Sequence, residues 1–162
     1  MDDLYSLAVQ LGGHLHALKV TLATAESCTG GLIGHLITEV PGSSAYYVGG
    51  VVAYSNEVKA RLLGVSRETL ELCGAVSHRT AEQMAVGARR LFGSDYALAV
   101  TGIAGPTGGT AQKPVGLTFV ALDAPEGTHV RRFVWSGDRH QNKLSSARAA
   151  LELLWEYLNA NP

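Results

Sequence analysis

The sequence predicts a three-layer α/β/α fold, in which a mixed, mostly parallel sheet of about five strands carries helices on both faces. Strand-like segments alternate with helical ones along most of the 162-residue chain, as is typical of this class. Residues 96–100 are almost entirely apolar, as expected for a strand covered on both faces. Two late strand-like segments flank Ala-Pro-Glu-Gly at 124–127, a hairpin signal that makes at least one strand antiparallel.

The first third of the chain predicts two helices and two strands. Apolar residues at helical spacing predict a helix over residues 3–17, although Gly12 and Gly13 weaken the pattern near its end. The β-branched, alternating residues 19–25 predict a strand, and a helical pattern runs from residue 32 to 37. A Val-Pro-Gly-Ser-Ser sequence then ends this helix, and residues 46–54 predict the second strand.

Three serines mark the starts of the next three helices. Ser55, Ser66 and Ser77 stand where an N-cap is expected, and glycines end the first and third of these helices. The apolar strand is followed by a glycine-rich loop over 101–114, strands over 115–122 and 129–135, and a helix over 138–158. This length suits one core, so we expect one domain over residues 1–162.

Composition and charge exclude several function classes. The formal net charge of −1 argues against nucleic-acid binding, and no apolar run is long enough to cross a bilayer. The N-terminus lacks the pattern of a signal peptide, so we expect a cytoplasmic protein without a membrane partner. Neither the two cysteines nor the six scattered histidines have metal-ligand spacing, so we expect no metal.

The loop after the first strand offers a nucleophile. Ser27 is followed by a turn and then a helix, whose first backbone N–H groups could stabilise a developing oxyanion, while Gly30 and Gly31 would allow close approach of a ligand. Ser27 or Thr29 could equally be only an N-cap. Cys28 could be a thiol nucleophile, or a small buried apolar residue.

The loop after the second strand offers a base. Lys59 lies near the start of a helix, where a partly buried amine could lose its proton and then accept that of a serine. Tyr54 could donate a hydrogen bond or stack on a ring. The alternatives are a solvated surface lysine and a tyrosine that packs in the core.

The loop after the third strand is long enough to suggest binding. Glycines and threonines from Thr101 onward, including Gly102, Gly105 and Gly108, suit phosphate or ribose, and Arg139 could contact a phosphate. The spacings of the Walker and dinucleotide-binding loops are absent. A mobile linker and an arginine in a surface ion pair are the alternatives.

Together these segments resemble the CinA C-terminal family, which includes nicotinamide-nucleotide amidohydrolases of the PncC type. The matching stretches are TAESCTGG (24–31), VPGSSAYYVGGVVAYSNEVKARLLGV (40–65), GAVS (74–77), TGIAGPTGGTAQKPVG (101–116) and GDR (137–139). One departure is visible, because the family pattern GDR-x-x-V-R ends here in Asn142-Lys143. Lys143 keeps the charge but lacks the planar fork of arginine.

The resemblance implies hydrolysis of nicotinamide mononucleotide to nicotinic acid mononucleotide and ammonia, without a cofactor. The family's serine falls on Ser27 and its lysine on Lys59, and we expect Tyr54 and Thr101 to orient the lysine or the amide. The expected substrate-binding residues are Thr29, Gly30, Gly31, Ser43, Ser44, Gly102, Gly105, Gly108 and Arg139.

Two other functions stay open at this point. A non-catalytic nucleotide-binding module, linked to competence or DNA damage, would keep the loops but need no reactive serine. A thiol hydrolase would use Cys28 instead. We also expect a homo-oligomer, with residues 48–52 and the region of Trp135 as candidate interfaces.

Overall fold

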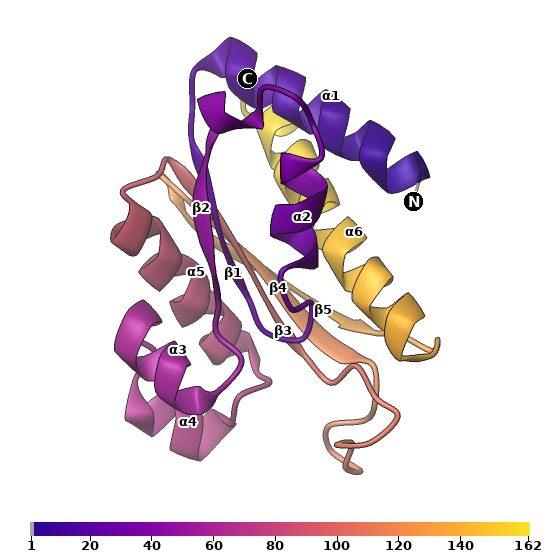
Figure 1. Cartoon of the computed structure of the whole chain (residues 1–162). Helices are drawn as coiled ribbons and strands as arrows, with labels where there is room; N and C mark the ends of the chain where they lie inside the picture. The colour runs from indigo at the N-terminus through magenta and orange to yellow at the C-terminus, as the bar shows by residue number, and fades with distance from the viewer. Residues whose placement is uncertain (1) are drawn as a thin grey trace.

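A five-stranded sheet forms the middle layer of the protein, as the computed structural model shows for residues 2–162 (Figure 1). Its strand order is β2-β1-β3-β4-β5, and only β4 runs against the other four, so the predicted mixed, mostly parallel sheet is confirmed. The strands are β1 (Leu22–Glu26), β2 (Tyr47–Val52), β3 (Tyr96–Gly102), β4 (Leu117–Ala124) and β5 (Gly127–Val134).

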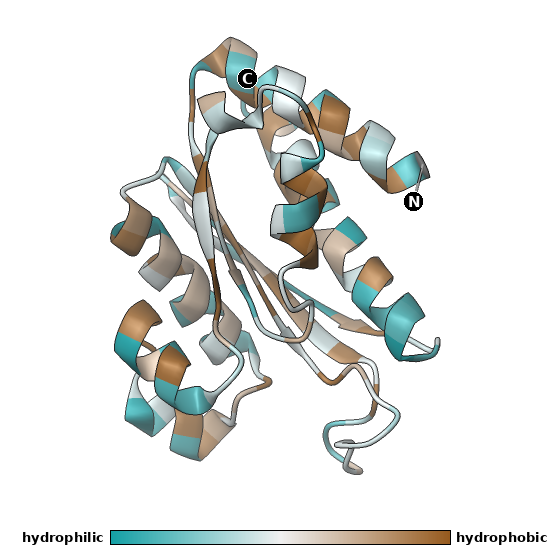
Figure 2. Cartoon of the chain, viewed as in Figure 1, coloured by the Kyte–Doolittle hydropathy of each residue, from teal (hydrophilic) through white to brown (hydrophobic). Residues whose placement is uncertain are grey.

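Helices cover both faces of the sheet. The helices are α1 (Asp2–Leu18), α2 (Leu32–Thr38), α3 (Asn56–Leu63), α4 (Arg67–Cys73), α5 (His78–Phe92) and α6 (Arg139–Ala160), with a 3₁₀ turn, η1, at Ser43–Ala45. In Figure 1, α1, α2 and α6 lie on one face and α3, α4 and α5 on the other. Hydrophobic and hydrophilic residues alternate along these helices in Figure 2, because one side of each packs inward. None of the described helices is both long and apolar enough to span a membrane.

The strands differ in burial according to their place in the sheet. Every residue of β1 and of β4 is buried, whereas burial alternates along the edge strands β2 and β5. Val48 and Val52 on β2 are accordingly exposed, while Trp135, just after β5, is partly buried and stacks on Phe133.

Most element boundaries lie within two residues of the sequence prediction, and the start of β1 differs by three. Strand β1 begins at Leu22 instead of residue 19, because Lys19 adopts a positive φ of 57° and the chain turns there before entering the sheet. Helix α1 runs through both of its glycines. A Cβ on Gly12 would stand 2.2 Å from the Tyr46 hydroxyl, so this glycine makes room for the tyrosine ring.

Small residues bring α5 and α3 close to the sheet. Alanines dominate the core on this face, and a Cβ on Gly87 of α5 would stand 1.8 Å from the backbone oxygen of Leu63 at the end of α3. Because α3 is fixed so closely against α5, the side chains that it sends toward the sheet are also fixed.

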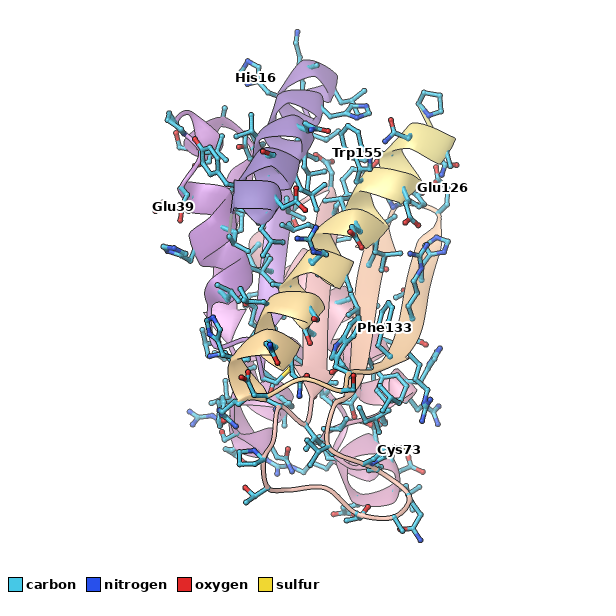
Figure 3. All side chains as sticks on the ribbon, turned by 90° about the vertical axis from the view of Figure 1, so that its right-hand side faces the viewer. His16, Glu39, Cys73, Glu126, Phe133 and Trp155 are labelled. Carbon is cyan, nitrogen blue, oxygen red and sulfur yellow. The ribbon has the colours of Figure 1, made fainter. Side chains whose placement is uncertain are left out.

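The register of the parallel strands brings three loops together. Glu26, the last residue of β1, pairs with Val52 of β2 on one side and with Val100 of β3 on the other. The residues that follow these positions therefore meet at one end of the sheet, which we call the carboxyl edge. Figure 3 shows this edge at the end of the molecule where Cys73 is labelled, with His16 at the opposite end.

Candidate active site

Ser27 lies on a tight turn at the carboxyl edge. Its backbone N–H donates to the Val100 oxygen at 3.0 Å, and its backbone oxygen accepts from the Gly30 N–H at 3.1 Å. Gly30 and Gly31 both have positive φ values, 61° and 102°, which residues with side chains rarely adopt. This turn places the buried Ser27 hydroxyl beside β2 and α3.

Lys59 of α3 points inward and meets this hydroxyl. Its side chain is buried, with 1% of the residue exposed, and its Nζ lies 3.1 Å from Ser27 Oγ. The same Nζ donates to the backbone oxygens of Ala53 at 2.9 Å and Tyr54 at 3.1 Å. No ion pair among the described residues includes Lys59, and burial lowers the pKa of its amine below the ordinary value of 10.5.

Ala53 connects the serine and the lysine through its backbone. Its N–H donates to the Glu26 oxygen at 2.8 Å, directly before Ser27, and its own oxygen accepts from Lys59 Nζ. The two functional groups are therefore held by one short backbone network, so their separation depends little on surface side chains.

A cavity of about 190 Å³ opens next to this pair. It is lined by Ser27, Cys28, Tyr54, Lys59, Ala75, Val76, Thr101, Gly102, Ala104 and Arg139. All four residues expected to take part in catalysis are in this set, together with Gly102 and Arg139 from the expected binding set.

Tyr54 and Thr101 contribute in ways that the sequence did not specify. Tyr54 contacts the lysine through its backbone oxygen, while 62% of the residue is exposed. The buried Thr101 hydroxyl donates to the Ala75 oxygen at 2.7 Å and so fixes the connection between α4 and α5 against the cavity. A Cβ on Gly102 would lie 2.6 Å from Thr118 Oγ1 and 3.1 Å from Cys28 Sγ, so only glycine fits there without a shift.

Arg139 joins the glycine-rich loop to the cavity. Its guanidinium donates to the Gly105 oxygen at 2.8 Å and to the Tyr54 hydroxyl at 3.3 Å. A second cavity of about 460 Å³ lies beside the first and shares Ala104 and Arg139 with it. The buried Asn142 supports this junction, because its amide donates to the Ala104 oxygen and accepts from the Gly137 N–H.

Seven of the nine expected binding residues do not line the first cavity: Thr29, Gly30, Gly31, Ser43, Ser44, Gly105 and Gly108. Thr29 is buried, and its hydroxyl has no hydrogen-bond partner among the described residues. A Cβ on Gly30 would lie 3.8 Å from Lys143 Nζ, so the lysine that stands in the family's arginine position is beside the Ser27 turn. Gly31 borders Val52, and Gly108 borders Ile103 in the loop.

The structure corrects the expectation for Ser43 and Ser44. Both belong to η1, which precedes β2. Directly after η1, the backbone oxygen of Tyr46 accepts a hydrogen bond from the Leu22 N–H at the start of β1. Because β1 and β2 are parallel, the segment before β2 lies at the opposite end of the sheet from Ser27. The chain therefore does not bring these two serines to its own Ser27 cavity.

The expected use of the first N–H groups of α2 is also wrong. The Leu32 N–H donates to the Thr29 oxygen, and the next two, of Ile33 and Gly34, donate to the Glu26 carboxylate. Within residues 2–162, the N–H groups of Cys28, Thr29 and Gly31 make no hydrogen bond to another residue. These earlier groups of the turn are the donors left for an oxyanion.

Cys28 is buried against the turn. Burial raises the pKa of its thiol to about 12, so the thiolate is scarce at neutral pH. Among residues 2–162, no group of three or more His, Cys, Asp or Glu side chains is placed to hold a metal ion.

Several site residues escaped the sequence analysis. Ala53 acts through its backbone oxygen, which leaves little trace in the identity of the residue. Glu26 and Asn142 act through their side chains, but on backbone groups that are distant in sequence. Ala75 and Val76 lie in the GAVS stretch, which was noted as a match but given no position near the serine.

Comparison with known proteins shows to which family the chain is similar. The model of the CinA C-terminal domain matches residues 4–158. A CinA-like protein of Geotalea daltonii is 56% identical over 161 residues, which cover 99% of this chain and 39% of that protein. The crystal structure of the competence/damage inducible protein CihA from Agrobacterium tumefaciens has a TM-score of 0.94 at 45% identity, covering 97% of this chain and 96% of that one.

A further solved structure agrees with these matches. The competence damage-inducible protein A (ComA) from Klebsiella pneumoniae has a TM-score of 0.95 at 34% identity, covering 98% of this chain and 99% of that one. The curated relatives are longer proteins, and this chain spans 32% to 39% of the length of those compared.

Proposed function

This chain belongs to the CinA C-terminal domain family, and from that premise we propose that it hydrolyses the carboxamide of nicotinamide mononucleotide. The products would be nicotinic acid mononucleotide and ammonia. The proposal is supported above all by one observation, the 3.1 Å contact between Lys59 Nζ and Ser27 Oγ beside a cavity.

The surroundings of Lys59 suit a general base. Two of its amine hydrogens can remain on the oxygens of Ala53 and Tyr54, which leaves the third position directed at Ser27. In the neutral amine this third position is a lone pair, which can accept the serine proton. Burial without a carboxylate partner favours the neutral form.

The reaction would proceed through an ester on Ser27. Ser27 Oγ bonds to the carboxamide carbon as its proton passes to Lys59, and the N–H groups of Cys28, Thr29 and Gly31 stabilise the oxyanion. Lys59 then protonates the leaving nitrogen, so the C–N bond breaks and ammonia departs. Water, deprotonated by Lys59, attacks the ester, which frees the acid and returns the proton to Ser27.

The two cavities suit the two parts of such a substrate. The cavity of about 190 Å³ matches the size of a pyridine ring with its amide. The neighbouring cavity of about 460 Å³ would take ribose and phosphate, with the Arg139 cation at the boundary between them.

Incubation of the purified protein with nicotinamide mononucleotide tests this proposal. We expect release of ammonia and formation of the acid nucleotide, both measured against time and enzyme concentration. Binding of the nucleotide without turnover would contradict the proposal and favour a non-catalytic nucleotide-binding module. If the protein neither bound nor hydrolysed the nucleotide, this substrate would be excluded for both functions.

A further inference from the structure

Glu26, the residue before Ser27, carries a buried carboxylate that has no role in the reaction described above. Only 2% of the residue is exposed, and no ion pair among the described residues includes it. Its Oε1 accepts from the Ile33 N–H at 2.8 Å, and its Oε2 accepts from the Gly34 N–H at 3.0 Å. The carboxylate at the end of β1 thus binds the first turn of α2.

These bonds close the turn that carries the nucleophile. The turn is fixed at its start by the sheet. The backbone oxygen of Glu26 accepts from the Ala53 N–H, and the Ser27 N–H donates to the backbone oxygen of Val100. It is fixed at its end by the Glu26 side chain, which holds Ile33 and Gly34. Glu26 therefore helps to fix both ends of the turn over residues 27–31, through its backbone at one end and its side chain at the other.

Helix α2 depends on this contact, because its own N-cap residue offers no side chain. The N-cap is Gly31, which makes no side-chain hydrogen bond to the helix. Glycine at this position permits the turn but leaves the first N–H groups without a local acceptor. Glu26 supplies the acceptor from the strand instead.

The space around the carboxylate is closely filled. A Cβ on Gly34 would lie 3.6 Å from Glu26 Oε2 and 2.9 Å from the Tyr47 hydroxyl. Tyr47 is in turn 2.6 Å from Thr24 Oγ1. The carboxylate consequently has little freedom to adopt another position while α2 is in place.

We propose that Glu26 is a positioning residue for Ser27. By occupying the N–H groups of α2, it keeps the Ser27 hydroxyl directed at Lys59 and leaves the N–H groups of the turn as the oxyanion donors. The proposal rests on the proposed function in one respect only, that Ser27 is the nucleophile.

The Glu26→Gln variant tests this role. The amide has nearly the same shape, but its NH₂ group cannot accept, so at least one of the two bonds to α2 is lost. The first readout is covalent labelling of Ser27 by a fluorophosphonate, with the labelled site identified by mass spectrometry. The second is kcat and KM for nicotinamide mononucleotide. We expect the labelling rate and kcat to fall about 10- to 100-fold, with KM changed less than about threefold, because small misplacements of a nucleophile are costly.

Ser66→Ala is the matched control, because Ser66 caps α4 through the Thr69 N–H. Both variants remove a helix cap, and we expect each to lower Tm by roughly 2–4 °C. Only Glu26→Gln should slow the labelling of Ser27. Wild-type labelling in a folded Glu26→Gln protein overturns the proposal.

A second variant covers the case in which Glu26→Gln does not fold. Glu26→Asp keeps the charge but is one methylene shorter, so it cannot hold both N–H groups in the same way. We expect slower labelling than in the wild type, and an unchanged rate overturns the proposal. The probe does not depend on the nucleotide, so Glu26-dependent labelling without turnover would support positioning and reject only the substrate. A wild-type protein that is not labelled at Ser27 rejects both.

Discussion

The helices of this protein start in two different ways. Four of them, α3 to α6, are capped by their own N-cap residues: Ser55, Ser66, Ser77 and Asp138 each accept from an N–H three residues later. Helix α2 has glycine at this position and is capped from the strand by Glu26. The difference lies at the one turn that carries Ser27.

This contrast separates the capping serines from Ser27, the nucleophile of the proposed reaction. The hydroxyls of Ser55, Ser66 and Ser77 bind their own helices. The Ser27 hydroxyl is free of this task because Glu26 performs it, and its partner is the amine of Lys59. A serine near a helix start is thus available for chemistry when another group caps the helix.

Ser27→Ala gives the largest effect that we predict. It should lower kcat for nicotinamide mononucleotide by about 10⁴-fold or more, because Ser27 carries the hydroxyl that contacts the Lys59 amine. Its Tm should stay close to that of the wild type, since Ser27 caps nothing. Ser66→Ala should show the reverse, a loss of about 1 kcal/mol of stability with unchanged kcat. A Ser27→Ala enzyme with wild-type turnover would remove this serine from the mechanism.

Much of the fold was accessible from the sequence because local rules and tertiary packing agree. Alternation, helical spacing and serine caps placed each element close to its observed bounds, and the apolar β3 segment indicated burial on both faces. The start of β1 was misjudged because Lys19 continues the strand-like pattern, although its backbone belongs to a turn.

Lys59→Arg should nearly abolish turnover while preserving a positive charge. We expect kcat to fall by about 10³-fold or more, because a guanidinium stays protonated and cannot accept the serine proton. Arg61→Lys is the control, because Arg61 is exposed on the same helix. It should leave kcat within about twofold of the wild type. Substantial activity in Lys59→Arg would show that Lys59 acts as a charge and not as a base.

The pH profile of the wild type tests the same base without a mutation. Burial lowers the pKa of Lys59 from 10.5, and the reaction needs the neutral amine. The neutral fraction grows as pH rises, so kcat/KM should increase by about tenfold per pH unit on the acidic limb and level off above the pKa. The midpoint should lie below 10.5. A rate that is flat, or that falls with rising pH over this limb, would contradict a neutral lysine base.

The site was less predictable than the fold. Ser27 and Lys59 were predicted to lie together because both follow parallel strands, whose carboxyl ends meet at one edge, and their side chains do meet. The same rule places Ser43 and Ser44, which precede β2, at the opposite end of the sheet from Ser27. Glu26 was missed because its bonds reach across seven and eight residues and match no local capping pattern.

Arg139→Lys should have a moderate effect, on binding more than on chemistry. A lysine cannot donate to both the Gly105 oxygen and the Tyr54 hydroxyl as the guanidinium does. We expect KM to rise about tenfold with kcat changed less than about threefold, measured by steady-state ammonia release. Arg132→Lys on the exposed side of β5 is the control and should leave both constants unchanged. A fall in kcat alone would assign Arg139 to the chemical step.

The smallest effect should come from Cys28→Ala, although Cys28 lies next to Ser27 and lines the same cavity. With a pKa of about 12, its thiol is almost wholly protonated at neutral pH and is a poor nucleophile. We expect kcat within about twofold of the wild type, and little inactivation by iodoacetamide, because the residue is a small buried group at this position. If alkylation of Cys28 and Cys28→Ala both abolished turnover while Ser27→Ala did not, the reactive group of this turn would be the thiol, and the contrast between α2 and the other helices would concern stability alone.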